Sequence, residues 1–461
     1  MGNYFGTDGF RGKAGERLTA EHAYKIGRFL GWYYAGEGER RVRAVIGKDT
    51  RRSSYSLEYA IAAGLTASGA DAYMLHVTTT PCVSFAAAGE NFDVGIMISA
   101  SHNPYTDNGI KLVNSNGEKM DDATTEKIER YLDGEWEFLG IPATDIPFAT
   151  GDEIGEIVDY SAGRNRYIGY LISLSRHSFK GFRVGLDCAN GSAWMIAKSV
   201  FEALGAKCHV IHAAPDGVNI NRDCGSTHIE SLCRCVREHQ LDVGFAFDGD
   251  ADRCIAVDET GREVNGDHIL YVLALSLRRE GNLVNNKVVT TVMSNLGLYR
   301  ALKAEGIDYE QTAVGDRYLY ENMQRTGNCI GGEQSGHIIL SKYATSGDGI
   351  LTAIKLMEEM IDSKTPLSKL SSSVQMLPQV TKNLRVADRS AVMEDAVIAE
   401  EIKTMEHSLN GSGRILLRKS GTEPLIRVMV EASTPALCEQ YACAVAELIE
   451  KRGYMRKENG I

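Results

Sequence analysis

Residues 94–104 of the chain read VGIMISASHNP. The run Val94–Ile98, apolar apart from one glycine, predicts a buried strand. Small and turn-forming residues follow and end that strand at Asn103-Pro104. We therefore expect Ser101 on a loop at the carboxyl end of a strand, where open α/β sheets bind ligands. Its hydroxyl is a candidate acceptor of a phosphoryl group, and an ordinary Ser/Asn/Pro turn is the alternative that this stretch alone leaves open.

Outward from this stretch, predicted strands alternate with predicted helices, which is typical of α/β layers. Helices are expected over 20–35, 56–68, 122–133 and 158–176, and strands over 42–47, 70–76 and 182–187. A chain of 461 residues is long enough for three or four domains. We predict three consecutive mixed α/β domains and a smaller α+β C-terminal domain around a central cleft. The predicted limits are 1–150, 151–258, 259–374 and 375–461.

Composition narrows the class of protein. The chain is 43% hydrophobic and 24% charged, as in ordinary globular proteins, and has no apolar run long enough to span a membrane. The N-terminus lacks a secretory signal, and none of the ten cysteines forms a C-x-x-C pair, so we expect a cytoplasmic protein with reduced thiols. A net charge of −11 disfavours binding to nucleic acid or to anionic membranes. A phosphate ligand would therefore need a local cluster of basic groups.

A second candidate site is the loop DGDADR, residues 248–253, between strands expected over 243–247 and 254–257. Asp248, Asp250 and Asp252 alternate along it and can converge on one hard divalent cation. A calcium EF-hand is the rival interpretation, since Glu259 falls at its twelfth position. That loop needs glycine where Arg253 stands and a helix on each side, so Mg²⁺ is the better prediction.

Three further loops carry chemistry. Arg11 projects from a glycine-rich N-terminal segment and suits a phosphate, with a solvated arginine on a turn as the alternative. Glu333 and Ser335 can grip sugar hydroxyls if their loop is extended, and a polar hairpin is the alternative. Near the C-terminus a phosphate cradle is predicted, with an anion nest between two arginines. Its residues are Arg418, Ser420, Gly421, Thr422 and Arg427. Lys48, Arg51 and Arg52 are interpreted instead as a solvated or structural rim.

Taken together and in this order, the motifs resemble the α-D-phosphohexomutase family over essentially the whole chain. The most discriminating stretches are FGTDG at 5–9, SASHNP at 99–104, GEQSGH at 332–337 and RKSGTEP at 418–424. They are most similar to the branch that acts on glucosamine phosphates. Phe10 and Ala251 depart from common family residues, but neither supplies a ligand side chain. The four predicted domains would then carry, in order, the phosphoserine, the metal, the sugar and the sugar's phosphate.

The resemblance implies a mechanism. Ser101 would carry phosphate, and a phosphoserine oxygen would share Mg²⁺ with the three aspartates. The phosphoryl group would pass to a 6-phosphosugar, form a sugar bisphosphate that also serves as activator, and return from the other end. The expected conversion of glucosamine 6-phosphate to glucosamine 1-phosphate lies on the route to UDP-N-acetylglucosamine. Arg253 would bind substrate, and Lys111 and His337, assisted by Arg11, are the candidates for proton transfer.

Several alternatives remain open on the sequence. A phosphoglucomutase or phosphomannomutase of the same family is the nearest, and a non-catalytic protein that binds sugar phosphate or calcium belongs to a different class. A Ser-His-Asp hydrolase using Ser101 would lack the G-x-S-x-G turn of that fold. The partner expected is a small sugar phosphate, with no nucleic acid and no membrane, and the chain would act as a monomer or a homodimer.

Overall fold

The structure is a computed structural model that describes residues 4–36, 40–141, 145–419 and 425–456. It divides into two compact units. The first consists of Met1–Ser294 and Ile307–Ser373, and the second of Asn295–Gly306 and Val374–Ile461. Among the described helices, none combines the length and the apolar character that crossing a bilayer requires.

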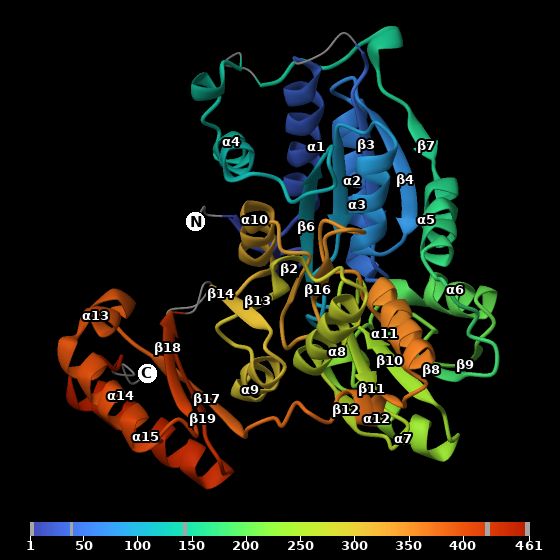
Figure 1. Ribbon diagram of the computed structural model, residues 1–461. Helices are drawn as coiled ribbons and strands as arrows, with labels where there is room; N and C mark the ends of the chain where they lie inside the picture. The colour runs from blue at the N-terminus through green and yellow to red at the C-terminus, as the bar shows by residue number, and fades with distance from the viewer. Residues whose placement is uncertain (1–3, 37–39, 142–144, 420–424, 457–461) are drawn as a thin grey trace. The chain divides into compact units, whose positions relative to one another are not determined.

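The first unit begins with a sheet of seven strands, in the order β1-β2-β6-β5-β3-β4-β7 (Figure 1). The strands are β1 Phe5–Gly6, β2 Gly9–Lys13, β3 Arg43–Lys48, β4 Asp71–Val77, β5 Val94–Ile98, β6 Asp107–Asn114 and β7 Ile157–Asp159. The central strands β4, β3 and β5 are parallel, whereas β6 and β2 continue the sheet in antiparallel fashion. Every residue of β5 is buried, as its apolar run predicts.

The helices of this first part are α1 Ala20–Ala35, α2 Arg52–Thr66, α3 Thr80–Gly89 and α4 Asp122–Leu132. The side chain of Thr19 accepts a hydrogen bond from the His22 N–H and fixes where α1 begins. Helix α1 packs closely on α2: a Cβ added at Gly27 or Gly64 would meet backbone atoms of the other helix at 2.3 and 2.1 Å. Helix α2 begins four residues earlier than the sequence predicts, because the polar residues before 56 complete its first turn.

One helix prediction for this region is corrected. The helix expected over 158–176 is α5 Ser161–Ser173, and the residues before it form β7, which pairs with β4. The first sheet thus continues past residue 150, the predicted end of the first domain. Strand β6, which carries Lys111, escaped prediction because polar residues interrupt its apolar run. Helix α3 escaped prediction although most of its residues are apolar and buried.

The second sheet has the order β12-β11-β10-β8-β9. Its strands are β8 Arg183–Asp187, β9 Lys207–Ile211, β10 Val243–Phe247, β11 Cys254–Val257 and β12 Glu263–Val264. It is accompanied by α6 Ala197–Ala203 and α7 Glu230–Glu238. Strands β10 and β11 are antiparallel neighbours and flank the loop 248–253, so this loop lacks the two helices of an EF-hand and that alternative is excluded.

The third sheet has the order β14-β13-β15-β16. Its strands are β13 Lys287–Thr291, β14 Asp308–Thr312, β15 Ile330–Gly332 and β16 Ile338–Leu340. The helices around it in the first unit are α8 Gly266–Arg279, α10 Asp316–Thr326, α11 Gly349–Ser363 and α12 Leu367–Leu370. Short 3₁₀ helices in this unit are η1 Glu137–Leu139, η2 Gly151–Glu153, η3 Ser192–Met195, η4 Gly225–Thr227 and η5 Val284–Asn286.

The second unit holds an antiparallel sheet of order β17-β19-β18, made of β17 Gln379–Arg385, β18 Arg414–Lys419 and β19 Leu425–Glu431. Its helices are α9 Leu296–Ala304, α13 Arg389–Glu394, α14 Ala396–Ser408 and α15 Pro435–Lys451. The predicted fold class, mixed α/β domains followed by a smaller α+β domain, is confirmed.

The sequence predicts the limits of α15 correctly, from its Thr434 cap to Gly453. The helical spacing of Leu437, Tyr441, Val445 and Leu448 predicts that these residues form its buried face, which the structure confirms only in part. Val445 is buried, but Leu437, Tyr441 and Leu448 are half-buried and pack against the margin of the core. The buried stripe is Cys438, Ala442, Val445 and Ile449. Small residues at the centre of this stripe let the helix lie close to the sheet, and the larger side chains cover the edges.

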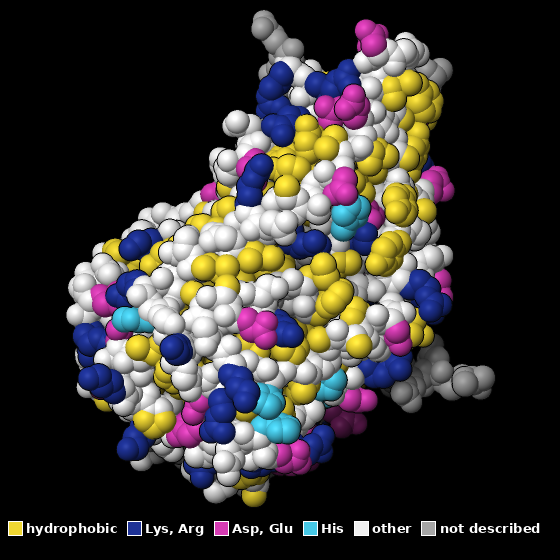
Figure 2. All heavy atoms as spheres, turned by 90° about the vertical axis from the view of Figure 1, so that its right-hand side faces the viewer, with side chains coloured by type: hydrophobic (Ala, Val, Ile, Leu, Met, Phe, Trp, Pro, Cys, Tyr) yellow, Lys and Arg dark blue, Asp and Glu magenta, His cyan; other side chains and the backbone are white. Residues whose placement is uncertain are grey.

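Acidic and basic side chains are interspersed with hydrophobic ones on the face that Figure 2 shows. The basic groups that the sequence associates with a phosphate in the first unit are Arg11, Lys111 and Arg253. Lys111 is buried, and the side chains of Arg11 and Arg253 are mostly covered.

Candidate active site

Ser101 lies on the loop that follows β5, as predicted. Its backbone has φ of 52°, a left-handed conformation that is costly for a residue with a Cβ. The Ser101 N–H donates to Ser99 Oγ at 2.9 Å, and the Ser99 N–H donates to the Gly109 carbonyl at 3.0 Å. The Ser101 hydroxyl donates to Asp248 Oδ2 at 2.6 Å. The loop thus presents the serine hydroxyl directly to the aspartate loop of the second sheet.

Two side chains hold the serine loop from behind. The guanidinium of Arg51 donates to the carbonyls of Ser101 and Asn103 at 3.1 and 2.5 Å, and the Asn221 side chain donates to the same two at 2.8 and 3.0 Å. Arg51 is fully buried and forms an ion pair with Asp49. Four hydrogen bonds to two carbonyls fix the backbone on which the Ser101 hydroxyl stands.

Of the two roles predicted for Lys48, Arg51 and Arg52, a solvated or a structural rim, the structural one applies to Lys48 and Arg51. Arg51 and Lys48 are buried, the latter in an ion pair with Glu58, and only Arg52 is exposed. Burying both cations is tolerable because each has a carboxylate partner. The closeness of Asp49 and Arg51 in the sequence could have suggested an ion pair. Their burial, however, depends on packing against the serine loop, which the sequence does not reveal.

Asp248, Asp250 and Asp252 are buried on the loop between β10 and β11. They each offer a carboxylate oxygen, and these atoms all lie within 4.8 Å of one another. Oδ1 of Asp250 and Oδ1 of Asp252 are buried without a hydrogen-bond partner among the described residues. Burial, and then the charges of the other two carboxylates, raises the pKa of Asp248 well above its usual value. Three buried carboxylates with unused oxygens form a site that fits a cation.

Basic groups offset part of this negative charge. Lys111 Nζ, on β6, lies 2.6 Å from Asp250 Oδ2 and 3.3 Å from Asp252 Oδ2. Burial alone would lower the pKa of Lys111, but the two aspartates raise it, so its amine is charged. Burial alone would raise the pKa of Asp252, but the positive charge of Lys111 and the contact with His337 hold this pKa well below its usual value. Asp252 and Asp248 also raise the pKa of Arg253 against the effect of its burial.

His337 is buried directly before β16, beside the aspartate loop 248–253. Its Nε2 accepts a hydrogen bond from the Gly347 N–H at 3.0 Å, and its Nδ1 lies 3.8 Å from Asp252 Oδ2. Burial would lower the pKa of His337, but Asp252 reverses the effect and raises it. With Nε2 as the acceptor, the neutral ring carries its proton on Nδ1, on the side of Asp252. Thr80 Oγ1 donates to Asp250 Oδ2 at 2.5 Å and joins the same network.

Glu333 and Ser335 lie in the turn that joins the antiparallel strands β15 and β16. The segment is therefore a hairpin, which was the alternative to an extended loop. Their side chains nonetheless share one side, because Ser335 Oγ donates to Glu333 Oε2 at 3.4 Å. The Gly315 N–H donates to Glu333 Oε1 at 3.2 Å. The pair is half-buried and has oxygen atoms available for hydroxyl groups.

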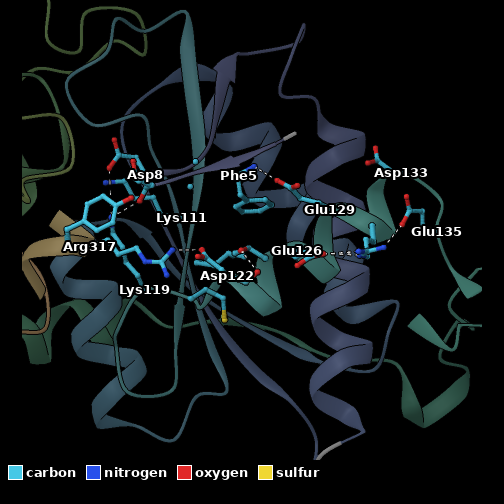
Figure 3. A pocket seen from close by; sticks show the side chains of 18 residues that line it. Phe5, Asp8, Lys111, Lys119, Asp122, Glu126, Glu129, Asp133, Glu135 and Arg317 are labelled. Carbon is cyan, nitrogen blue, oxygen red and sulfur yellow. Dashed lines mark hydrogen bonds and ion pairs between the residues drawn. The ribbon is translucent and has the colours of Figure 1, made fainter. Parts of the chain in front are cut away.

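A pocket of about 630 Å³ lies beside these groups in the first unit. Figure 3 shows Asp8, Lys111 and Lys119 together at one end, with carboxylates of α4 and of the residues after it at the other. Arg11 on β2 lies 3.6 Å from Asp8. Lys119 lies 3.8 Å from Asp8 and pairs with Asp316, whose pKa it lowers to about 2 against the effect of burial.

Asp8, Lys119 and Asp316 are contacts of the site that sequence reasoning did not single out. Asp8 stands within the quoted FGTDG segment, so a signal was present, but nothing local connects it with Lys119 or Asp316.

The predicted phosphate cradle lies in the second unit. Arg418 on β18 and Arg427 on β19 are directly paired in the antiparallel register, and both are half-buried. Ser420, Gly421 and Thr422 lie outside the described residues. In the first unit, by contrast, the structure brings Ser101, the three aspartates, Lys111 and His337 into one network.

Comparison with known proteins identifies the class. All four phosphoglucomutase/phosphomannomutase domains match: α/β/α domain I at residues 2–137, α/β/α domain II at 165–261, α/β/α domain III at 265–377 and the C-terminal domain at 382–448. The chain belongs to the phosphoglucomutase/phosphomannomutase family and is an isomerase.

Relatives that are highly similar in sequence narrow the class further. The phosphoglucosamine mutase of Lachnospira eligens is 60% identical over 455 residues, which cover 98% of this chain and 100% of that protein. The phosphoglucosamine mutase of Lachnoclostridium phytofermentans is 57% identical over 456 residues, or 99% of this chain and 100% of that protein. A solved phosphoglucomutase/phosphomannomutase family protein from Burkholderia thailandensis has the same fold, with a TM-score of 0.78, 22% identity and 98% coverage of both chains.

Proposed function

We propose that the protein is a phosphoglucosamine mutase, which interconverts glucosamine 6-phosphate and glucosamine 1-phosphate through a phosphoserine at position 101. The observation that carries the proposal is the 2.6 Å hydrogen bond from the Ser101 hydroxyl to Asp248, within a buried cluster of three aspartates. Relatives at 60% and 57% identity, both phosphoglucosamine mutases, support the choice of sugar.

The proposed reaction has two balanced transfers. In the first, the bond from Ser101 Oγ to phosphorus breaks, a bond from the sugar hydroxyl oxygen to phosphorus forms, and the proton of the sugar hydroxyl passes through the neighbouring acid–base groups to Ser101 Oγ. The product is a sugar bisphosphate, which reorients within the site so that its other phosphate faces Ser101. In the second, the other phosphoryl group returns to Ser101, whose proton passes to the sugar oxygen. Ser101 therefore gives and receives one phosphoryl group in each turnover.

The residues around Ser101 suit a reaction that depends on positioning and charge. Asp248 accepts the serine hydrogen bond and is placed to orient the hydroxyl when phosphate returns. Lys111 is charged in its pairing with Asp250 and Asp252, so it acts first as a proton donor or a charge partner for phosphoryl oxygens. We assign proton transfer at the sugar hydroxyl to Lys111 and His337, with Arg11 assisting.

The aspartate cluster fits Mg²⁺. Asp248, Asp250 and Asp252 would hold it together with a phosphoserine oxygen, an all-oxygen set of the kind that this hard cation prefers. When bound, the cation withdraws negative charge from the transferring phosphoryl group.

Substrate contacts follow from the remaining site residues. Glu333 and Ser335 would bind sugar hydroxyls, and Arg253 would bind the substrate beside them. Arg418, Arg427 and the segment with Ser420, Gly421 and Thr422 would bind the sugar's own phosphate. We also propose that the four domains carry, in order, the phosphoserine, the metal, the sugar and the sugar's phosphate. The protein would lie in the cytoplasm and act as a monomer or a homodimer.

A coupled assay tests the function. Purified protein receives glucosamine 6-phosphate, Mg²⁺ and a trace of sugar bisphosphate, and the appearance of glucosamine 1-phosphate is followed. We expect turnover by the wild type and a loss of at least about 10⁴-fold in Ser101→Ala, as for other removed nucleophiles. Equal turnover by the two proteins would contradict the proposal. A higher kcat/KM for glucose or mannose phosphates would instead favour a phosphoglucomutase or phosphomannomutase.

A further inference from the structure

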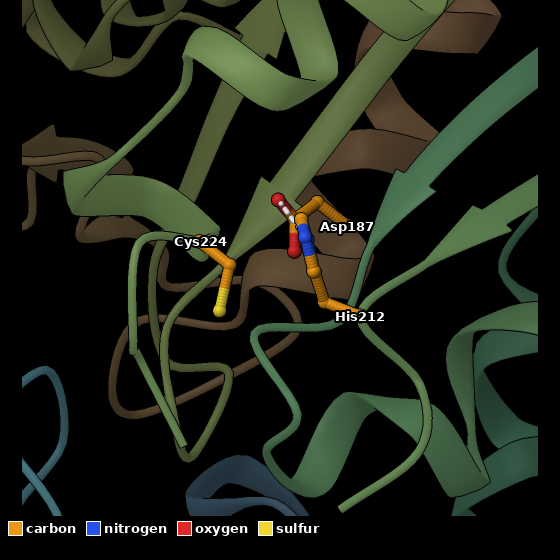
Figure 4. Close-up of side chains that lie close together, drawn as sticks. All are labelled: Asp187, His212 and Cys224. Atoms are coloured by element: carbon orange, nitrogen blue, oxygen red, sulfur yellow. Dashed lines mark ion pairs between the residues drawn. The ribbon is translucent and has the colours of Figure 1, made fainter. Parts of the chain in front are cut away.

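A second cluster of metal-ligating side chains lies on the edge of the second sheet where its parallel strands end. Asp187 is the last residue of β8, and His212 directly follows β9, which is the parallel neighbour of β8. Cys224 comes from the loop just before η4. One ligand atom from each side chain lies within 4.8 Å of the other two. Figure 4 shows the imidazole and the carboxylate facing each other, with Cys224 beside them on a neighbouring loop.

The carboxylate of Asp187 has capacity that the protein does not use. Asp187 is fully buried. Its Oδ1 accepts from the Ala189 N–H at 2.9 Å and its Oδ2 from the Gly225 N–H at 3.0 Å. A carboxylate has about four acceptor positions, so two remain. Among the described residues no lysine or arginine forms an ion pair with it; the basic group in reach is His212, whose Nδ1 lies 3.0 Å from Oδ2.

His212 also has a ring nitrogen that is available to a ligand. Its Nδ1 is buried and makes no hydrogen bond of good geometry with any described residue, although it lies close to Asp187. Two donors on a tetrahedral Zn²⁺ with bonds of about 2.0–2.3 Å stand roughly 3.3–3.7 Å apart. The 3.0 Å between Nδ1 and Oδ2 is near that value, and Sγ of Cys224 lies within 4.8 Å of both side chains, so it would move about 1 Å closer to complete the set.

We propose that Asp187, His212 and Cys224 bind a borderline-soft divalent cation of the Zn²⁺ class. A set of one oxygen, one nitrogen and one sulfur suits such an ion and does not suit Mg²⁺, which takes oxygen ligands. On binding, the Cys224 S–H bond breaks, a sulfur–metal bond forms and one proton leaves to solvent. Three protein ligands leave a fourth position for water.

The site has a structural consequence for Ser101. The segment between His212 and Cys224 carries Asn221, whose side chain binds the carbonyls of Ser101 and Asn103. The Asn221 N–H also donates to the Ala189 carbonyl at 2.9 Å, two residues after Asp187. A cation on the three side chains therefore fastens both ends of this segment to the sheet and braces the support of the serine loop.

Co²⁺ binding tests the site without using activity. Thiolate bound to Co²⁺ gives a near-ultraviolet charge-transfer absorption, which the all-oxygen aspartate site cannot produce. We expect this absorption to saturate at one equivalent in the wild type and to be competed away by Zn²⁺. Cys224→Ser and His212→Asn should each weaken binding more than about 100-fold, since loss of even outer contacts costs 10–100-fold.

Matched controls lie in neighbouring elements of the second sheet's layer. Cys233→Ser on α7 and His209→Asn on β9 change the same residue types away from the cluster and should keep the absorption. Circular dichroism establishes that each variant is folded. No charge-transfer absorption in the wild type at millimolar Co²⁺ would overturn the proposal, as would an undiminished one in Cys224→Ser. Either result leaves the mutase assignment untouched, because that assignment depends on Ser101 and the three aspartates.

Discussion

Two clusters lie along one edge of the second sheet and differ in what surrounds them. The three aspartates follow β10, whereas Asp187 and His212 end or follow β8 and β9, the next strands in the sheet. The aspartate cluster has oxygen donors, a serine hydroxyl at 2.6 Å and Lys111 at 2.6 Å. The Asp187 cluster has mixed donors and backbone N–H partners. Both clusters thus lie at the same edge of the sheet. The types of donor atom determine which cation each cluster would bind, and only the aspartate cluster has a serine hydroxyl and a lysine beside it that could take part in a reaction.

The largest expected effect separates the two clusters directly. Asp250→Asn should lower kcat on the order of 10³–10⁴-fold, because a metal ion supplies several kcal/mol of charge stabilisation to the transition state. Asp187→Asn, at the other cluster, should lower kcat less than about tenfold, since it touches no reacting group. Steady-state kinetics at saturating Mg²⁺ measure both. Similar losses in the two variants would erase the distinction.

A second experiment examines Arg51, the buried arginine that supports the serine loop. Arg51→Met leaves Asp49 buried without its partner and removes two hydrogen bonds to the serine loop. We expect it to lower the free energy of unfolding by about 3–5 kcal/mol. Arg52→Met, at the exposed neighbouring position, should change it by less than about 0.5 kcal/mol. Urea denaturation compares the variants, and equal stability would show that burial of Arg51 contributes nothing.

A third experiment extends the comparison to a buried carboxyl held by hydrogen bonds. Asp348 accepts from the Leu351 N–H and from Tyr167, and burial raises its pKa to about 6. Because the folded state favours the neutral acid, the stabilisation is complete below about pH 4 and is lost as pH rises through 6.

The variant Asp348→Asn stays neutral throughout and keeps one acceptor for the helix. Relative to the wild type, its free energy of unfolding should rise by about 3 kcal/mol between pH 4 and 7. Asp395→Asn is the control with the opposite sign. Burial opposes the shift, but Tyr454 and Arg452 lower the pKa of Asp395 to about 2, so the wild type loses that stabilisation as pH falls below 4. A pH-independent difference for Asp348→Asn would show that its carboxyl ionises normally.

The smallest effect concerns the residue that links the two clusters. Asn221→Ala removes two of the four hydrogen bonds to the serine loop and leaves those of Arg51. We expect kcat to fall about tenfold, or about 1.4 kcal/mol, with a smaller change in KM. Asn219→Ala alters the same loop without contacting the serine loop and should retain kcat. A change confined to KM would assign Asn221 to substrate binding instead.

Much of the fold was predictable because it rests on local periodicity. The apolar runs of β3, β4 and β5, and the caps of α1 and α15, lie in the sequence itself. Strand β6 was missed because Asn108 and Lys111 interrupt its apolar run, and the sheet buries both. Strand β7 is short and half-exposed, so only its pairing with β4 defines it.

The site was predictable wherever its residues share one loop. The three aspartates are close in sequence, and the loop geometry brings their oxygens together as expected. For Arg51 the sequence leaves a solvated and a structural role open, because only packing on the serine loop reveals its partners. The Asp187 cluster escaped notice because its donors come from separate segments that only the parallel pairing of β8 and β9 unites.

The central claim is that Ser101 relays a phosphoryl group. Intact-mass spectrometry of the purified protein, with peptide mapping, tests it before and after addition of glucosamine 6-phosphate. We predict a species heavier by one phosphoryl group, mapped to Ser101, that is discharged by the sugar phosphate and restored by sugar bisphosphate. Turnover with no phosphate on Ser101, or with a phosphate there that the substrate never removes, would contradict the account.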